Sequence, residues 1–189
     1  MVSSTGIRAS QKIVFSSAEF LLSSLIKLCE NSIDSIITRN QVWNEIKSND
    51  ECRDWTKSHF YVTLNNLKYS KYINVDSKNN SVMYTNKAKL KLVDLIAKDR
   101  VGVDSYRFIS FDIPELLRKQ RDAFRRTIKR MGFIQIQKSL WVINKDVGDL
   151  VELAALEYGI EKYVIYFVSA KSDIDGIIDR KFSRLRPNN

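Results

Sequence analysis

Cationic side chains are concentrated after residue 117, at a spacing that could serve the binding of phosphate groups. Six of them recur at intervals of four or seven residues, so they form two stripes along one predicted helix. The first stripe holds Arg118, Arg125 and Lys129, and the second holds Lys119, Arg126 and Arg130. Such stripes can lie along nucleic acid phosphates, bind an acidic small molecule, or simply face solvent. We take the first stripe as a set of candidate DNA contacts.

A single carboxylate, Asp112, precedes this basic run and is the second candidate for chemistry. One carboxylate per chain could take part in a magnesium site if water or phosphate oxygens complete the octahedral shell. The simpler interpretation is that Asp112 caps the basic helix and interacts with its dipole. Apart from magnesium under the first interpretation, the sequence indicates no cofactor.

Polar side chains on a helix predicted to end near Tyr69 form the third candidate site. Phe60, Leu64 and Leu67 share one side of this helix, which leaves the polar residues on the other. The candidate DNA contacts are Thr56, Lys57, Ser58, Tyr61 and Asn65. An asparagine can bind adenine through two hydrogen bonds, although the same face could also be a solvated surface of a protein-binding module. The only histidine, His59, has no evident triad or metal partner nearby, so we do not expect catalysis from it.

Two further helices precede this one. The first is predicted from Lys12 to Glu30, with a wide apolar face. The second begins at a capping box formed by Thr38 and Gln41. Its inward residues are Val42, Trp43 and Ile46.

A hairpin is predicted after the third helix, from the apolar runs 72–75 and 82–84. Lys78 lies at its polar tip, where it would meet the phosphate backbone without reading sequence. Three helices followed by a hairpin is the order of a winged helix-turn-helix domain. Lys71 stands where a glycine commonly closes the recognition helix.

The second half follows the order strand, helix, strand, strand, helix, strand, which is the split βαβ or ferredoxin-like arrangement. Its strands and helices are predicted at 106–111, 114–131, two runs between 133 and 143, 147–158 and 163–168, with Gly132 and Gly159 as helix stops. The last strand is apolar on both sides, so both should be covered. One sheet face packs on the two helices. We expect a second copy to cover the other, and therefore a homodimer.

The boundary between the halves is expected where the spacing of apolar residues changes from a helical to a strand-like period. Residues 86–98 are predicted as an amphipathic helix, and DRVGVDS after it is the best linker candidate. The sequence therefore predicts an α+β protein with a winged helix-turn-helix domain over 1–98, a linker over 99–104 and a ferredoxin-like dimerisation domain over 105–189.

Composition favours a nucleic acid partner. The chain of 189 residues carries 31 basic and 22 acidic residues, for a net charge of +9. Residues 1–100 hold 15 basic and 10 acidic residues, so both halves are basic. No apolar run is long enough to span a bilayer, and the N-terminus lacks a signal-peptide core, so a cytoplasmic protein is expected. Cys29 and Cys52 are expected to be reduced thiols, although the sequence does not exclude a bridge.

The run Phe111 to Glu115 resembles the middle domain of the PaaX-like repressors, which are bacterial transcription factors named for phenylacetic acid catabolism. The residues that follow at the family spacing are Arg118, Arg121, Asp122, Arg125, Gly132, Phe133, Gln137, Ser139 and Trp141. That middle domain is similar to the ferredoxin-like nuclease of the CRISPR spacer-acquisition complex. The nuclease carries an aspartate at the end of its first strand, and Asp112 falls at that place.

The resemblance implies a transcriptional regulator, a repressor that binds a palindromic operator in double-stranded DNA as a dimer. The alternative that it raises is a metal-dependent nuclease or a CRISPR spacer-acquisition component that uses Asp112. A non-catalytic assembly protein with a basic platform for nucleic acid is a third possibility. Family members respond to an acyl-CoA ligand, but the domain that follows in them is absent from this sequence, so no small-molecule effector is assigned.

Overall fold

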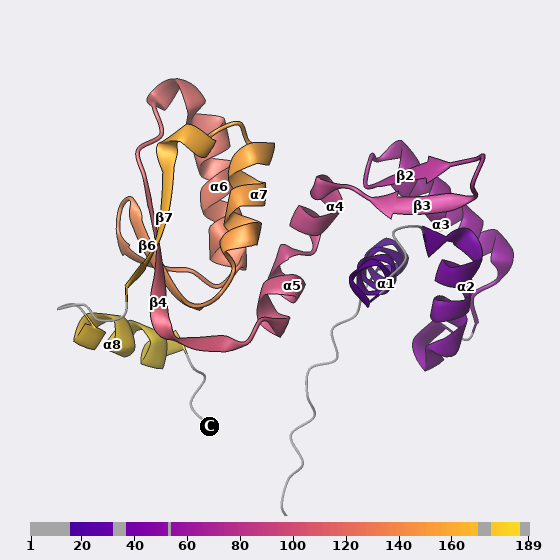
Figure 1. Ribbon diagram of the computed structural model, residues 1–189, viewed down its shortest axis with the longest axis horizontal. Helices are drawn as coiled ribbons and strands as arrows, with labels where there is room; N and C mark the ends of the chain where they lie inside the picture. Colours follow the sequence, from indigo (N-terminus) through magenta and orange to yellow (C-terminus); the bar gives the residue numbers. More distant parts are fainter. Residues whose placement is uncertain (1–15, 32–36, 53, 170–174, 186–189) are drawn as a thin grey trace, which may run out of the picture. The chain divides into compact units, whose positions relative to one another are not determined.

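The computed structural model describes residues 16–31, 37–52, 54–169 and 175–185, which divide into two compact units between Tyr84 and Thr85 (Figure 1). Both units combine helices with antiparallel strands. The predicted α+β class is therefore confirmed. The predicted helix start at Lys12 lies outside the described residues.

The first unit surrounds its core with three helices and a small sheet. Its elements are α1 (Ser17–Asn31), β1 (Ile37–Thr38), α2 (Arg39–Ser48), the 3₁₀ turn η1 (Asp50–Cys52), α3 (Lys57–Tyr69), β2 (Ile73–Asp76) and β3 (Ser81–Tyr84). The strands pair in the order β1-β3-β2. Leu21, Leu25 and Phe60 are among its fully buried residues. The sequence did not predict β1, because two residues carry no detectable period.

Local signals set the ends of α2 and α3. The predicted capping box is confirmed: the Thr38 hydroxyl accepts from the Gln41 backbone N–H, and the Gln41 side chain accepts from the Thr38 N–H at 2.8 Å. At the end of α3, Lys71 adopts a φ of 59°. Because the Tyr72 N–H then donates to the Leu67 carbonyl at 2.9 Å, the helix closes in the manner that usually requires glycine. Cys29 and Cys52 are free thiols.

The second unit is built on a four-stranded antiparallel sheet. Its strands are β4 (Gly102–Phe111), β5 (Ile134–Gln137), β6 (Leu140–Lys145) and β7 (Val164–Ser169), in the order β5-β6-β4-β7. Its helices and turns are α4 (Asn86–Lys91), α5 (Val93–Asp99), η2 (Glu115–Leu117), α6 (Arg118–Arg130), α7 (Gly148–Glu157), η3 (Glu161–Tyr163) and α8 (Asp175–Leu185). Gly132 and Gly159 both have positive φ, at the two predicted helix stops.

The main core lies between one face of this sheet and helices α6 and α7. Ile109, Trp141 and Ile143 from the sheet belong to the same buried cluster as Phe124 of α6 and Leu150 of α7. These residues follow the strand and helix periods of the sequence. The predicted packing of two helices on one sheet face is therefore present.

Helices α4 and α5 pack in the second unit, which differs from the boundary expected near residue 98. Leu90, Val93 and Ala97 join the main core. Arg130 of α6 donates to the carbonyls of Leu90 and Lys91 and to Asp94. These bonds hold the end of α4 against α6. Arg130, a member of the predicted second stripe, thus has a structural role.

The expected linker over 99–104 is likewise largely part of the second unit. Lys145 of β6 donates to the carbonyls of Ala97 and Lys98 at the end of α5. Arg100 forms an ion pair with Asp149 at 2.6 Å, and Gly102 already pairs with Lys145 in the sheet. The sequence pattern identified a change of period here, but a change of period does not reveal which core a helix joins.

The opposite sheet face is covered in part by α8 of the same chain. Ile178 is fully buried against Phe108, Ile134 and Val142. Phe182 stacks on Tyr106 with an interplanar angle of 8°. The expectation that a second copy covers this face therefore did not take α8 into account.

Strand β7 lies at the sheet edge and is not covered on both sides as predicted. Its inward residues, Val164 and Tyr166, pack on the main core. On the face that α8 partly covers, Ile165 is 64% exposed and Phe167 is 41% exposed. Part of the predicted apolar surface thus remains open.

We expect the docking of α8 to be sensitive to alkaline pH through Tyr106. Its hydroxyl donates to Asp179, and this bond, together with burial, raises the pKa of Tyr106 to about 12 from 10.0. Since the folded pKa is raised, the stabilisation is present below about pH 10 and is lost as the pH rises through about 12. Below about pH 10 the wild type should therefore be more stable than Tyr106→Phe by about 1 kcal/mol in unfolding free energy. This difference should disappear as the pH rises through about 12.

Chemical denaturation at several pH values checks this expectation. Tyr69→Phe is the control, because Tyr69 is 83% exposed. It should match the wild type at every pH. A difference between wild type and Tyr106→Phe that stays constant from pH 8 to 12 would contradict the role given to this hydroxyl.

Candidate nucleic-acid interface

The outer face of α3 is an exposed surface of mixed polar and aromatic side chains. Burial of Phe60, Leu64 and Leu67 fixes the rotation of the helix about its axis. The exposed residues on the other side are Ser58, Tyr61, Val62, Asn65, Lys68 and Tyr69. Ser58, Tyr61 and Asn65 are thus together on one accessible face, as predicted. Lys68 and Tyr69 extend this face but were not among the predicted contacts.

The N-terminus of α3 is anchored by side chains of its own unit. The Thr56 hydroxyl accepts from the His59 N–H at 3.1 Å, so Thr56 is the helix cap. His59 is within hydrogen-bond distance of Ser17, with 3.2 Å between Nε2 and Oγ, and packs edge-on against Trp55. These contacts give His59 a structural setting, while Lys57 remains exposed at the first helical position.

The tip of the β2–β3 hairpin is shaped by Asp76. Its carboxylate accepts from the Lys78 backbone N–H at 2.8 Å and from the Asn79 side chain at 3.0 Å. Asn80 takes a left-handed φ of 54°, which asparagine tolerates better than most residues. The Lys78 side chain is left exposed at the end of an ordered turn.

In the second unit, the predicted first stripe divides into residues with different surroundings. Arg118 lies 3.7 Å from Glu115 and 3.9 Å from Asp122, so its charge is partly compensated. Arg125 lies over the Phe111 ring and donates to the Lys138 carbonyl at 3.4 Å. Lys129 is exposed and has no ion pair among the described residues.

A small pocket opens beside Arg125 and Lys129, with a volume of about 250 Å³. It lies between α6 and the β5–β6 hairpin, and its lining consists of Arg125, Arg126, Lys129, Gln135, Lys138 and Trp141. The sequence did not single out Gln135, Lys138 or Trp141 as site residues. A signal was present for Gln135, because it alternates with the apolar Ile134 and Ile136 in the predicted strand. Its pairing with Trp141 across the hairpin had to come from the fold.

Asp112 is exposed just after β4, and its backbone N–H donates to the Tyr163 carbonyl at 3.1 Å. The expectation that it caps the basic helix is wrong, because α6 begins at Arg118 after a separate turn and has no side-chain cap. Glu115, in the turn before α6, is the acidic residue near the N-terminus of that helix. Its hydrogen bond with Arg121 lowers the pKa of its carboxyl below the usual value. The described residues contain no group of three or more His, Cys, Asp or Glu side chains that could hold a metal ion.

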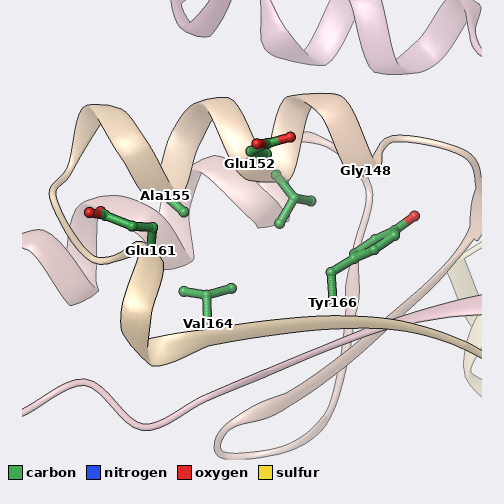
Figure 2. Close-up of a pocket in the computed structure, with 7 residues that line it drawn as sticks. Gly148, Glu152, Ala155, Glu161, Val164 and Tyr166 are labelled. Carbon is green, nitrogen blue, oxygen red and sulfur yellow. The ribbon is translucent and has the colours of Figure 1, made fainter.

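A second pocket lies between α7 and β7 and has a volume of about 340 Å³ (Figure 2). Figure 2 shows Val164 and Tyr166 pointing from the strand toward the helix, whereas the carboxylate of Glu161 extends away from them. Glu152 and Glu161 are the charged residues of the lining. Burial and the neighbouring Asp146 raise the pKa of Tyr166. Because its charged lining residues are acidic, this pocket does not suit nucleic acid phosphates.

Comparison with known families gives one finding for the second unit. Residues 103–177, from β4 into α8, match the family model of the PaaX protein central Cas2-like domain. This part of the chain is similar to the central domain of the PaaX proteins. The resemblance drawn from Phe111–Glu115 and the residues after it is therefore confirmed. Searches of curated proteins and of solved structures each gave no match.

The matched residues include the four-stranded sheet with α6 and α7. They do not include the first unit, α4 or α5. Any role of the α3 face therefore rests on the structure of the first unit itself. Among the described residues, no helix combines the length and the apolar character needed to cross a membrane.

Proposed function

We propose that this protein is a DNA-binding transcriptional regulator of PaaX-like type, a repressor that binds a palindromic operator as a homodimer. The observation that carries the proposal is the exposed face of α3 in a unit joined to a PaaX-type domain. The first unit has the order helix, strand, helix, helix and hairpin, which we interpret as a winged helix-turn-helix domain. In such domains the third helix enters the major groove.

In this proposal the α3 face reads bases and the hairpin positions the protein. Tyr61 and Asn65 lie where an inserted helix meets base edges, and Lys57 and Ser58 lie at the end that enters the groove. Thr56 would contribute mainly by holding that end, since its oxygen is used by the cap. Lys78 would contact a phosphate and add affinity without specificity.

The second unit would set the spacing of two half-sites. Its strand order and its two helices on one face support a ferredoxin-like domain. The exposed outer face of β7 supports dimerisation, since Ile165 and Phe167 are apolar and no other described strand pairs with the outer edge of β7. A two-fold contact there would bring the same surface of both copies together.

Sedimentation equilibrium of the whole chain tests the dimer. We expect the wild type to have twice the monomer mass, and Ile165→Lys to weaken the association at least tenfold, because burying an unpaired ammonium group is unfavourable. Leu116→Lys is the matched control, since Leu116 is an apolar side chain that is 94% exposed on another element. A wild type that is monomeric throughout the concentration range would contradict this part of the proposal.

Selection from a randomised duplex library, in the presence of magnesium, tests the function itself. Sequencing the retained duplexes should give an intact, enriched, palindromic motif. Cleaved DNA without a motif, with cleavage abolished in Asp112→Ala, would overturn the regulator in favour of the metal-dependent nuclease. Binding without either a motif or cleavage would instead favour a sequence-independent assembly protein.

A further inference from the structure

The pocket between α6 and the β5–β6 hairpin carries a concentrated positive charge. Four of its six lining residues are cationic, namely Arg125, Arg126, Lys129 and Lys138, and none is acidic. Among the described residues, the Asp122 carboxylate lies 3.9 Å from the Arg125 guanidinium, and the exposed Glu115 interacts electrostatically with Lys138. Arg126 and Lys129 have no ion pair in the described part of the chain. Cations brought this close repel one another unless an anion lies between them.

Two buried N–H donors at this pocket have no acceptor among the described residues. Trp141 is 6% exposed, and its indole Nε1 is buried without a hydrogen-bond partner. The Nε of Arg125 is likewise buried without a hydrogen-bond partner. A buried donor without an acceptor is costly, and such groups in native proteins usually have a bound water, ion or ligand as their partner.

We propose that this pocket binds a phosphate group. A phosphate offers several acceptor oxygens around one centre, which matches a set of donors that come from a helix and a hairpin. Arginine is well suited to phosphate because its planar guanidinium offers two donors in parallel. The volume of about 250 Å³ fits a phosphate or diphosphate rather than a large cofactor. Gln135 also lines the pocket, and its side-chain Nε2 donates to the Lys138 carbonyl at 3.3 Å.

The phosphate could belong to a small phosphorylated molecule or to a nucleic acid backbone, and the binding chemistry is the same for both. This inference gives a specific role to Arg125 and Lys129, which the sequence predicted as candidate DNA contacts, and it does not depend on the recognition of an operator by α3. The two can therefore fail separately, because the pocket and α3 lie in different units.

Nuclear magnetic resonance of the ¹⁵N-labelled full chain tests the site directly. The chain has 3 Trp residues, so it gives three indole N–H signals, and Trp141→Phe identifies the one from Trp141. We expect this signal to shift saturably when inorganic phosphate or pyrophosphate is added at constant ionic strength, while the signals of Trp43 and Trp55 stay in place. A short duplex without the selected operator is the third probe.

The probes also distinguish the source of the phosphate. A shift with phosphate and pyrophosphate alone assigns the pocket to a small phosphorylated ligand, and a shift with the duplex as well assigns it to the nucleic acid backbone. Arg126→Ala and Lys129→Ala should each weaken binding about fivefold or more. Lys119→Ala, which removes an exposed cation of the same helix outside the pocket, should leave it unchanged. No saturable shift with any probe, or equal binding by all these variants, would overturn the proposal.

Discussion

Replacing Tyr61 and Asn65 together by alanine should lower the affinity for the selected operator by about a hundredfold or more. A well-placed base contact contributes roughly 1–3 kcal/mol of discrimination. Both side chains are exposed on α3, and neither belongs to the buried set that holds the helix in its unit. The loss should therefore occur without a change in stability beyond about 0.5 kcal/mol.

Fluorescence anisotropy at several salt concentrations distinguishes sequence-specific binding from non-specific electrostatic binding to the phosphates. The double variant should bind the operator and a scrambled duplex equally, with the salt dependence of non-specific binding unchanged. Lys78→Ala should instead weaken both duplexes alike and reduce the slope of log affinity against log salt by about 1.

Asn66→Ala is the matched control for this prediction. Asn66 carries the same amide on the same helix, about 100° around the axis from Asn65. It should bind the operator nearly as well as the wild type. If Asn66→Ala loses as much affinity as the double variant, or if the double variant still prefers the operator, α3 is not the element that recognises the DNA sequence.

Replacing Ile178 by alanine should release α8 from the sheet, at a cost of about 2–4 kcal/mol. Ile178 is fully buried and belongs to a small cluster that is separate from the main core. Because that core does not contain Ile178, we expect local undocking of α8 rather than unfolding of the whole unit. Phe108 and Val142 would then become accessible.

Hydrogen exchange of the α8 amides measures this effect. Exchange in Ile178→Ala should be about thirtyfold faster or more, with little change in α6 and α7. The exposed apolar face should also increase self-association in sedimentation. Both observations are needed, because faster exchange alone could report fraying of the helix.

The neighbouring Ile177 provides the matched control, since it is the same residue type and is 43% exposed. Ile177→Ala should change exchange in α8 by less than about threefold. Equal effects of the two substitutions, or a loss of stability spread over the whole second unit in Ile178→Ala, would show that α8 does not dock as an independent cover.

The PaaX-type domain and the candidate reading helix were both predictable because their signals are local. A capping box, a glycine with positive φ and a repeat of apolar residues each act within one or two turns of chain. Thr38, Gly132 and the apolar face of α3 are examples, and each is found in the predicted role. The side of α3 that faces solvent followed directly from the side that is buried.

The sequence by itself thus determined the types and order of the main elements, the residues that α3 exposes and the resemblance of the second unit to the PaaX central domain. Only the tertiary structure decided that α4 and α5 join that unit, that α8 covers part of the sheet, and that Trp141 meets Arg125 and Lys129. Each of these depends on contacts between residues far apart in the chain. Periodicity shows that a face must be buried, but not against which surface, since many apolar surfaces satisfy the same requirement.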